Sequence, residues 1–268
     1  MAATQETRNM ALFCDFENIA LGVRDAKYAQ FDINKVVERL LLKGSIVVKK
    51  AYCDWERYKE FKAVMHGASF ELIEIPHLRQ SGKNSADIRM VVDALDLCYT
   101  KSHVDTFVLL SGDSDFSPLV SKLRENAKVV IGVGVKNSTS DLLIANCDEF
   151  IYYDDLVRED EAKRRAAKKR KEGRAGGGAK GTAPGDDKKQ EAIELILETV
   201  EALLAERGEG ERIWGSMVKQ ALKRRKPEFN ESYYGFRAFS DLLEEAEQRK
   251  VLKLERDEKS GGYLIRTA

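Results

Sequence analysis

The alternation of short apolar runs with helical patterns over the first 155 residues constrains the fold most. Several runs are almost entirely Val, Ile, Leu and Phe, as expected of strands covered on both faces. The predicted strands are Met10–Asp15, Ser45–Cys53, Ser69–Ile75, Thr106–Ser111, Val129–Val133 and Phe150–Tyr153. The predicted helices are Ile33–Leu42, Trp55–Met65, Ser85–Tyr99, Phe116–Asn126 and Ser138–Ala145. This alternation predicts an α/β domain with a parallel sheet and helices on both faces.

A change of composition marks the end of this domain. Residues 158–190 contain 12 Lys and Arg against 6 Asp and Glu, whereas the whole chain has 45 of each. Three consecutive glycines at 176–178 indicate a flexible linker. A basic segment attracts polyanions through counterion release, and a solvated helix extension explains the charge equally well. We therefore expect an α/β domain over 8–156, a basic, Gly-rich linker over 157–187 and a second domain over 188–268.

The second domain is predicted to be small and of the α+β class. Apolar residues recur at helical spacing in Ala192–Ala205, and Ile213–Lys223 and Tyr234–Arg249 predict two more helices. Val251–Leu254 and Tyr263–Ile265 bracket a turn-rich segment, which predicts a β-hairpin. Helices followed by a closing hairpin are typical of a winged helix-turn-helix domain.

Cysteine usage and hydropathy exclude several classes of protein. The four cysteines lie singly in apolar stretches without a C-x-x-C pair, which argues against a zinc site and a disulfide framework. Scattered cysteines of this kind fit reduced thiols in a cytoplasm. No apolar run reaches the length of a membrane-spanning helix, and the first ten residues do not resemble a secretory signal. We expect a cytoplasmic protein that does not bind membranes.

Four aspartates fall where a sheet of this kind binds its ligand. Asp15 ends the first predicted strand, and Asp113 and Asp115 follow the predicted strand 106–111. Asp87 lies near the start of a predicted helix. Ligands bind beyond the carboxyl ends of parallel strands, at the point where the strand order reverses. If the strands that precede them are neighbours at that point, Asp15, Asp113 and Asp115 converge on one crevice, and Asp87 closes it.

A cluster of three or four carboxylates needs a cation, because the carboxylates otherwise repel one another and their pKa values rise. Hard oxygen ligands select Mg²⁺ or Mn²⁺ over zinc. These metals lower the pKa of a bound water and stabilise charge on a phosphate. The aspartates therefore predict divalent-metal phosphodiester chemistry, although a helix N-cap alone would also explain Asp115. Gly112 beside them would allow the backbone to approach a ligand closely.

Four stretches of the first domain include or follow these aspartates: FCDFENIA, KNSADIRMVVDAL, VLLSGDSDFSPLVSKLRENAKVVIGVG and SDLLIANCDEFIYY. Together they resemble the NYN domain of the LabA-like branch of the PIN-like nuclease superfamily, over about residues 8–156. The resemblance implies a Rossmann-like sheet with an acidic Mg²⁺ or Mn²⁺ site that cleaves RNA with a metal-activated water. By motif position it implies that the catalytic metal ligands are Asp15, Asp87, Asp113 and Asp115. It also implies that Asn18 is a polar partner on the substrate side.

The second domain contains SMVKQALKRRKPEFNESYYGFRAFSDLLEEAE followed by VLKLERDEKSGGYLI. These stretches resemble an OST-HTH (LOTUS) domain over about residues 190–266, which implies a winged-helix module that binds RNA or a protein partner. Winged helices generally indicate duplex DNA, so the expectation of RNA comes from the resemblance. The basic run around Lys219 and Lys223 could contact phosphates or complement the dipole of its helix.

Further residues near the predicted crevice are candidates for binding RNA. Arg79 and Lys83 lie in the loop before Asp87 and could hold phosphates, although a solvated loop explains them equally well. Ser140 could position the substrate, with a helix N-cap as the alternative. Asp93 lies about 120° around the helix from Asp87 and is not expected to share the metal.

These patterns favour a divalent-metal-dependent ribonuclease, expected to act as an endonuclease on single-stranded or structured RNA. The first alternative is a non-catalytic RNA-binding or adaptor protein with an idle metal site, which the complete set of four acids disfavours. The second is a TOPRIM-type enzyme, which normally has Glu in place of Asp15 and leaves Asp87 unexplained. The sequence leaves open whether the chain forms a homodimer.

Overall fold

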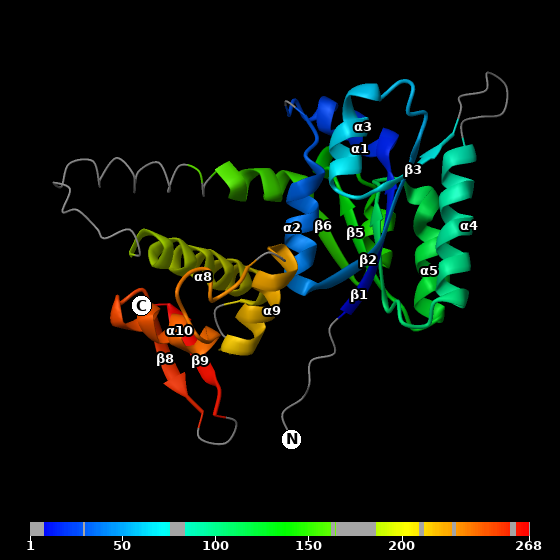
Figure 1. The fold of residues 1–268 in the computed structure, drawn as a ribbon. Coiled ribbons are helices and arrows are strands. Elements are labelled where there is room, and N and C mark those ends of the chain that lie inside the picture. The colour runs from blue at the N-terminus through cyan, green and yellow to red at the C-terminus, as the bar shows by residue number, and fades with distance from the viewer. Residues whose placement is uncertain are drawn as a thin grey trace. The chain divides into compact units, whose positions relative to one another are not determined.

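The computed structural model describes residues 8–28, 30–75, 84–161, 164, 186–208, 212–226, 229–257 and 261–267. The chain divides near residue 171 into two compact units, and each is described by itself (Figure 1). No helix within the described ranges is long and apolar enough to cross a membrane. Residues 165–185, most of the predicted basic linker, lie outside the described residues.

A six-stranded parallel sheet forms the centre of the N-terminal unit, as predicted. Its strands are β1 Arg8–Asp15, β2 Gly44–Cys53, β3 Glu71–Glu74, β4 Thr106–Leu110, β5 Val129–Gly134 and β6 Glu149–Tyr152. All six predicted strands are therefore present, with ends shifted by at most two residues. The spatial order is β3-β2-β1-β4-β5-β6, so it reverses between β1 and β4. In this doubly wound arrangement ligands bind at the reversal.

Helices cover both faces of the sheet because alternate residues of β1 are buried on opposite sides. The helices are α1 Phe16–Asp25, α2 Ile33–Lys43, α3 Lys59–Gly67, α4 Ser85–Thr100, α5 Ser117–Glu125 and α6 Asp141–Asn146. Met10, Leu12 and Cys14 pack in one core with α1, α2 and α3. Ala11 and Phe13 pack in a second core with α4, α5 and α6. Figure 1 shows α2 on one side of the sheet and α4 and α5 on the other.

Helix α1 is not among the predicted helices, and it contains Glu17 and Asn18. Both residues lie in the first turn of this helix. The Asp15 carboxylate accepts a hydrogen bond from the backbone N–H of Asn18 (3.3 Å) and so caps the helix. Ile19 and Val23 bury one side of α1 in the core. The helix was missed because ten residues contain too few apolar repeats to separate it from a loop.

Helices α3 and α6 begin later than predicted. Residues 55–58 form turns before α3, because Trp55 and Tyr58 pack against the ring of Phe16 with centroid distances of 5.0 and 5.5 Å. Their apolar spacing therefore reflects core contacts and not a helical turn. Residues 136–138 form a short 3₁₀ helix, and α6 begins only after Ser140.

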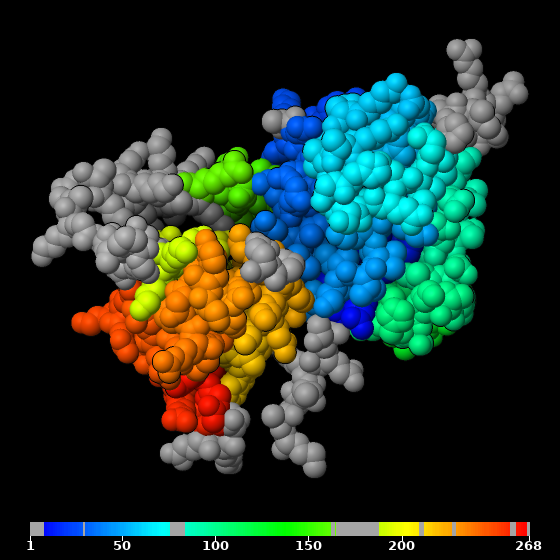
Figure 2. Space-filling view, viewed as in Figure 1, coloured from blue at the N-terminus to red at the C-terminus, as the bar shows by residue number. Residues whose placement is uncertain are grey.

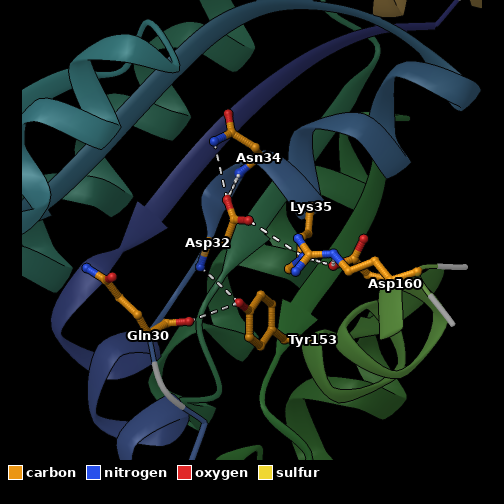
Figure 3. A network of polar contacts seen from close by, with 7 residues as sticks. Gln30, Asp32, Asn34, Lys35, Tyr153 and Asp160 are labelled. Atoms are coloured by element: carbon orange, nitrogen blue, oxygen red, sulfur yellow. Dashed lines mark hydrogen bonds and ion pairs between the residues drawn. The ribbon is translucent and has the colours of Figure 1, made fainter. Parts of the chain in front are cut away.

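A polar network joins the residues after β6 to the start of α2 (Figure 3). The Tyr153 hydroxyl accepts a hydrogen bond from the backbone N–H of Asp32 (2.9 Å) and donates one to the backbone carbonyl of Gln30 (3.4 Å). Lys35 forms ion pairs with Asp32 (3.6 Å) and with Asp160. Tyr153 and Asp160 belong to the helical residues 153–161. These contacts therefore attach that helical segment to the N-terminal unit.

The C-terminal unit combines helices with a small antiparallel sheet, as predicted. Its described elements are α8 Asp186–Arg207, β7 Ile213–Trp214, α9 Gly215–Arg225, α10 Phe239–Gln248, β8 Leu252–Arg256 and β9 Tyr263–Thr267. The sheet order is β7-β9-β8, in which β8 and β9 form the predicted hairpin. Two details differ from prediction. Ile213 belongs to a short strand before α9, in which it pairs with Ile265. Residues 231–235 form turns that end at Gly235 (φ +85°), so α10 begins after them and not at Tyr234.

Candidate active site

The reversal of strand order places the carboxyl ends of β1 and β4 side by side. Cys14 of β1 pairs with Leu110 of β4, so the residues that follow, Asp15 and Ser111, lie at the same edge of the sheet. The two strands are therefore neighbours at the reversal, which is the condition under which the aspartates were expected to converge. Asp113 follows Ser111 by two residues, so it belongs to the loop that starts at this edge.

Asp15 is the most enclosed carboxylate at this edge, with 8% of its surface exposed. One carboxylate oxygen accepts the Asn18 N–H that caps α1, and the other accepts a hydrogen bond from the Ser111 hydroxyl (3.0 Å). Burial and, second, repulsion from Asp87 raise the pKa of Asp15 from 3.8 to about 7, although these two hydrogen bonds act to lower it. The side chain is fixed in position, and its negative charge is only partly compensated.

The loop after β4 holds Asp113 and Asp115 through its own backbone. The Ser111 hydroxyl accepts a hydrogen bond from the N–H of Asp113 (3.2 Å). The Asp113 carboxylate in turn accepts one from the N–H of Asp115 (3.0 Å) and caps the 3₁₀ helix η1 (Ser114–Phe116). The N-cap of this helix is therefore Asp113 and not Asp115, which is exposed. Ser111 thus links Asp15 and Asp113 through one hydroxyl group.

Asn18 and Gly112 connect α1 to the same loop. The side-chain oxygen of Asn18 accepts a hydrogen bond from the N–H of Gly112 (2.8 Å). Gly112 is required for packing, because a Cβ there would lie 2.3 Å from the backbone oxygen of Ser138. The segment at 138–139 therefore requires a glycine at this position, and the expected close approach of a ligand stays a prediction. Asn18 holds the loop that contains Asp113.

Asp87 lies in the first turn of α4. Burial raises its pKa from 3.8 to about 6, and repulsion from Asp113, Asp115 and Glu17 contributes. The mutual repulsion of Asp15, Asp87 and the two aspartates after β4 shows that the four predicted residues lie near one another. The predicted rise in carboxylate pKa is therefore found at Asp15 and Asp87.

The donor atoms of this cluster suit a hard divalent cation, because they are carboxylate oxygens whose repulsion a cation would relieve. Within the described ranges, however, no group of three or more His, Cys, Asp or Glu side chains is arranged to hold a metal ion. Side chains of the cluster would therefore have to move closer together for all of them to coordinate one ion.

Sequence reasoning missed Ser111, Glu17 and Arg57 at this site. Ser111 is fully buried and is the polar residue that follows a strand buried along its whole length. Arg57 forms an ion pair with Glu17 (3.2 Å), and the Arg57 side chain is half exposed. Its guanidinium group is thus a cation beside the carboxylates. The sequence contained a signal for Ser111, a polar end to an apolar strand, but none that brings Arg57 to Glu17.

Three predicted substrate-binding residues have other positions or are not described. Ser140 caps α6, because its hydroxyl accepts a hydrogen bond from the N–H of Leu142 (3.2 Å). Arg79 and Lys83 lie outside the described residues. Asp93, which was not expected to share the metal, instead accepts a hydrogen bond from Tyr52.

A shallow groove adjoins the cluster at Asp115. It is lined by Ser114, Asp115, Ser117, Pro118, Ser121 and Leu142. Leu142 is 57% exposed, so the groove combines hydroxyl groups with an apolar side chain. Such a surface suits a sugar or a base more than a free anion, because Asp115 repels negative charge.

Family comparison confirms both resemblances found in the sequence. Residues 9–154 match the NYN domain, and residues 187–263 match the OST-HTH/LOTUS domain. The first match contains the whole aspartate cluster. The second covers the unit that begins with α8.

Two individual proteins are similar to part of this chain. An uncharacterised protein of Methanocaldococcus jannaschii is 27% identical over 117 residues, which are 44% of this chain and 45% of that protein. The chain thus spans less than half of this relative. The crystal structure of a protein of unknown function from Vibrio parahaemolyticus RIMD 2210633 has a TM-score of 0.50 and 28% identity. That similarity covers 57% of this chain and 97% of the other.

Proposed function

Because the chain belongs to the NYN domain family, a PIN-like nuclease family, and also has an OST-HTH/LOTUS domain, we propose that it is a metal-dependent endoribonuclease. The observation that supports this most is the convergence of Asp15, Asp87, Asp113 and Asp115 at the reversal of strand order. The two domains imply a nucleic-acid partner, and within that class we propose RNA.

Asp15, Asp87, Asp113 and Asp115 would hold Mg²⁺ or Mn²⁺. When bound, the metal supplies an activated water and neutralises charge on the phosphate. The protein's own contribution is preorganisation of two of the four carboxylates, because hydrogen bonds from Ser111 and from backbone N–H groups fix Asp15 and Asp113 before substrate binds.

Arg57 is a further candidate for binding the RNA backbone in this proposal. Its guanidinium group lies beside Glu17 at the cluster. The side chain is half exposed, so it can contact a phosphate without a rearrangement of the protein. The groove from Asp115 to Leu142 would receive the neighbouring nucleotide. Arg79 and Lys83 remain proposals from the sequence alone.

The C-terminal domain would bind the RNA and present it to the NYN domain. Tyr233 is 62% exposed, and the ammonium group of Lys188 lies over its ring at 4.4 Å. An exposed aromatic ring beside a cation suits stacking with a base and contact with a phosphate. Lys219 adds a further cation on α9.

The decisive test is cleavage of a single-stranded RNA by the full chain in Mg²⁺, in Mn²⁺ and in EDTA. Wild type should cleave only with metal. Asp113→Asn should not cleave although it still binds RNA, because Asn keeps the cap of η1 but lowers the charge that holds a cation. Asp93→Asn is the matched control and should cleave like wild type. Cleavage by Asp113→Asn at the wild-type rate would refute the mechanism.

A second candidate function is a non-catalytic RNA-binding adaptor. It is favoured by the lack, among the described residues, of a side-chain group already arranged around a metal. The same experiment separates the two functions. RNA binding without cleavage in either metal, for wild type and Asp113→Asn alike, would identify the adaptor.

A further inference from the structure

The outer face of α4 is not explained by the proposed chemistry. Three of its large apolar side chains are mostly exposed: Ile88 (62%), Val92 (55%) and Tyr99 (64%). Leu95, which is half-buried, lies between Val92 and Tyr99 in sequence. The opposite face of α4 already fills the core with Met90, Ala94 and Cys98. Figure 2 shows α4 at the surface of the N-terminal unit. Helices of soluble domains normally have polar residues on such a face.

The four outer residues form one continuous stripe. At 3.6 residues per turn, Ile88, Val92, Leu95 and Tyr99 lie within about 60° of one another around the helix. Their spacing of four, three and four residues is that of the apolar seam along which two helices pack. The stripe therefore suits a second helix more than a flat surface.

We propose that this stripe is a homodimer interface in which α4 packs antiparallel against α4 of a second copy. The stripe is symmetrical about a point between Asp93 and Ala94. A two-fold axis through that point places Ile88 opposite the partner's Tyr99, and Val92 opposite the partner's Leu95. A self-complementary pattern of this kind is what a two-fold interface requires.

Charge complementarity supports a second copy in the antiparallel orientation. Arg89 and Asp96 lie on the same flank of the stripe, about 80° to 100° around the helix from Ile88. In an antiparallel two-fold pair, equal flanks meet, so Arg89 lies beside the partner's Asp96 at both ends. A parallel pair would place this flank against the opposite one, where Val91 lies. Arg89 binds Asp93 through Nε (3.0 Å), so its other nitrogens can meet a second carboxylate.

The size of the stripe predicts a weak, reversible dimer. One helix face is at or below the lower end of stable interfaces, roughly 1,200 Å² in total. The two-fold axis also has a consequence for the candidate site. It places Asp87 and the partner's Asp87 on the same side of the helix pair, about 20 Å apart along its axis at 1.5 Å per residue. The dimer would thus present two acidic clusters on one side.

Sedimentation of the full chain over a wide range of concentrations tests the interface. Wild type should show a monomer–dimer equilibrium. Val92→Glu should raise the dissociation constant about tenfold or more, because it places a carboxylate in the seam. Val64→Glu is the matched control, since Val64 is a 39% exposed helical valine on α3, and it should dimerise like wild type. A wild type that stays monomeric, or a Val92→Glu variant that dimerises normally, would overturn the proposal.

A mixing experiment tests the orientation and the identity of the partner. Arg89→Asp alone and Asp96→Arg alone should each dimerise more weakly, because like charges then face each other at both ends. Mixed in equal amounts, the two variants should recover the wild-type dissociation constant, since each Asp then faces an Arg. Circular dichroism of each variant checks that the domain is folded. Weak association in the mixture would exclude the antiparallel arrangement.

Discussion

Asp87 and Asp93 lie six residues apart on α4 and have opposite electrostatic environments. Burial and the repulsion of Asp113 and Asp115 raise the pKa of Asp87 to about 6. No hydrogen bond or ion pair among those described lowers it. Asp87 therefore keeps an uncompensated charge, at the edge of the sheet where ligands bind.

Asp93 is partly buried, which by itself would raise its pKa. Hydrogen bonds from the Tyr52 hydroxyl (2.9 Å) and from Arg89, with the charge of Lys50 (3.3 Å), lower the pKa instead. The charged form of an aspartate on α4 is thus stabilised by its partners at Asp93 and repelled by neighbouring carboxylates at Asp87. Asp93 therefore stabilises the fold through its partners, whereas Asp87 keeps a repelled charge, which fits its proposed role as a metal ligand.

The largest expected effect is on catalysis. Asp87→Asn should lower the rate of RNA cleavage by about 100-fold or more, because it removes one of the charges that hold the metal. Asp93→Asn should change the rate by less than about threefold, because Asp93 binds Tyr52, Lys50 and Arg89. Single-turnover cleavage in Mg²⁺ measures both rates. Equal losses in the two variants would show that the comparison has no catalytic meaning.

The fold could be predicted because the central strands of the sheet are buried on both faces. β4 has all five residues buried, and such a run is visible in the sequence as uninterrupted apolar residues. Helix α1 could not be predicted in this way, because its first turn depends on capping by Asp15. Residues 55–58 show the opposite error, in which core contacts of Trp55 and Tyr58 imitate a helical spacing.

The convergence of Asp15, Asp113 and Asp115 was predictable because neighbouring strands at a reversal end together. The roles of Ser111 and Gly112 were not, because they depend on contacts across the fold. The Ser111 hydroxyl reaches Asp15 across 96 positions of sequence, and Gly112 is packed against the segment at Ser138. No local pattern records such distances.

The next effect is on stability and has opposite signs at the two positions. Without divalent metal at pH 7, Asp87→Asn should raise the free energy of unfolding, because it removes a repelled charge. Asp93→Asn should lower it by about 1–3 kcal/mol, because hydrogen bonds to a charged group are lost. Calorimetry of the N-terminal unit's transition in EDTA measures both changes. A loss of stability in both variants would mean that repulsion at Asp87 is already relieved.

The pH dependence should separate the two aspartates further. The pKa of Asp87 is raised in the folded state, so its contribution is fully present below about pH 4 and lost as the pH rises through about 6. The pKa of Asp93 is lowered, so its contribution is present above about pH 4 and lost as the pH falls through the folded-state value. The gain in Asp87→Asn should therefore grow between pH 4 and pH 7, measured in EDTA. A gain that is independent of pH would point to packing instead of charge.

The smallest expected effect isolates one hydrogen bond of the compensated aspartate. Tyr52→Phe removes only the hydroxyl that donates to Asp93 and should lower the free energy of unfolding by about 1 kcal/mol. Lys50 and Arg89 still pair with Asp93, so its carboxylate stays ionised. The rate of RNA cleavage should not change, because Tyr52 belongs to the compensated position. A reduced rate at wild-type RNA affinity would show that Asp93 influences the acidic cluster through α4. The two aspartates would then not have separate roles.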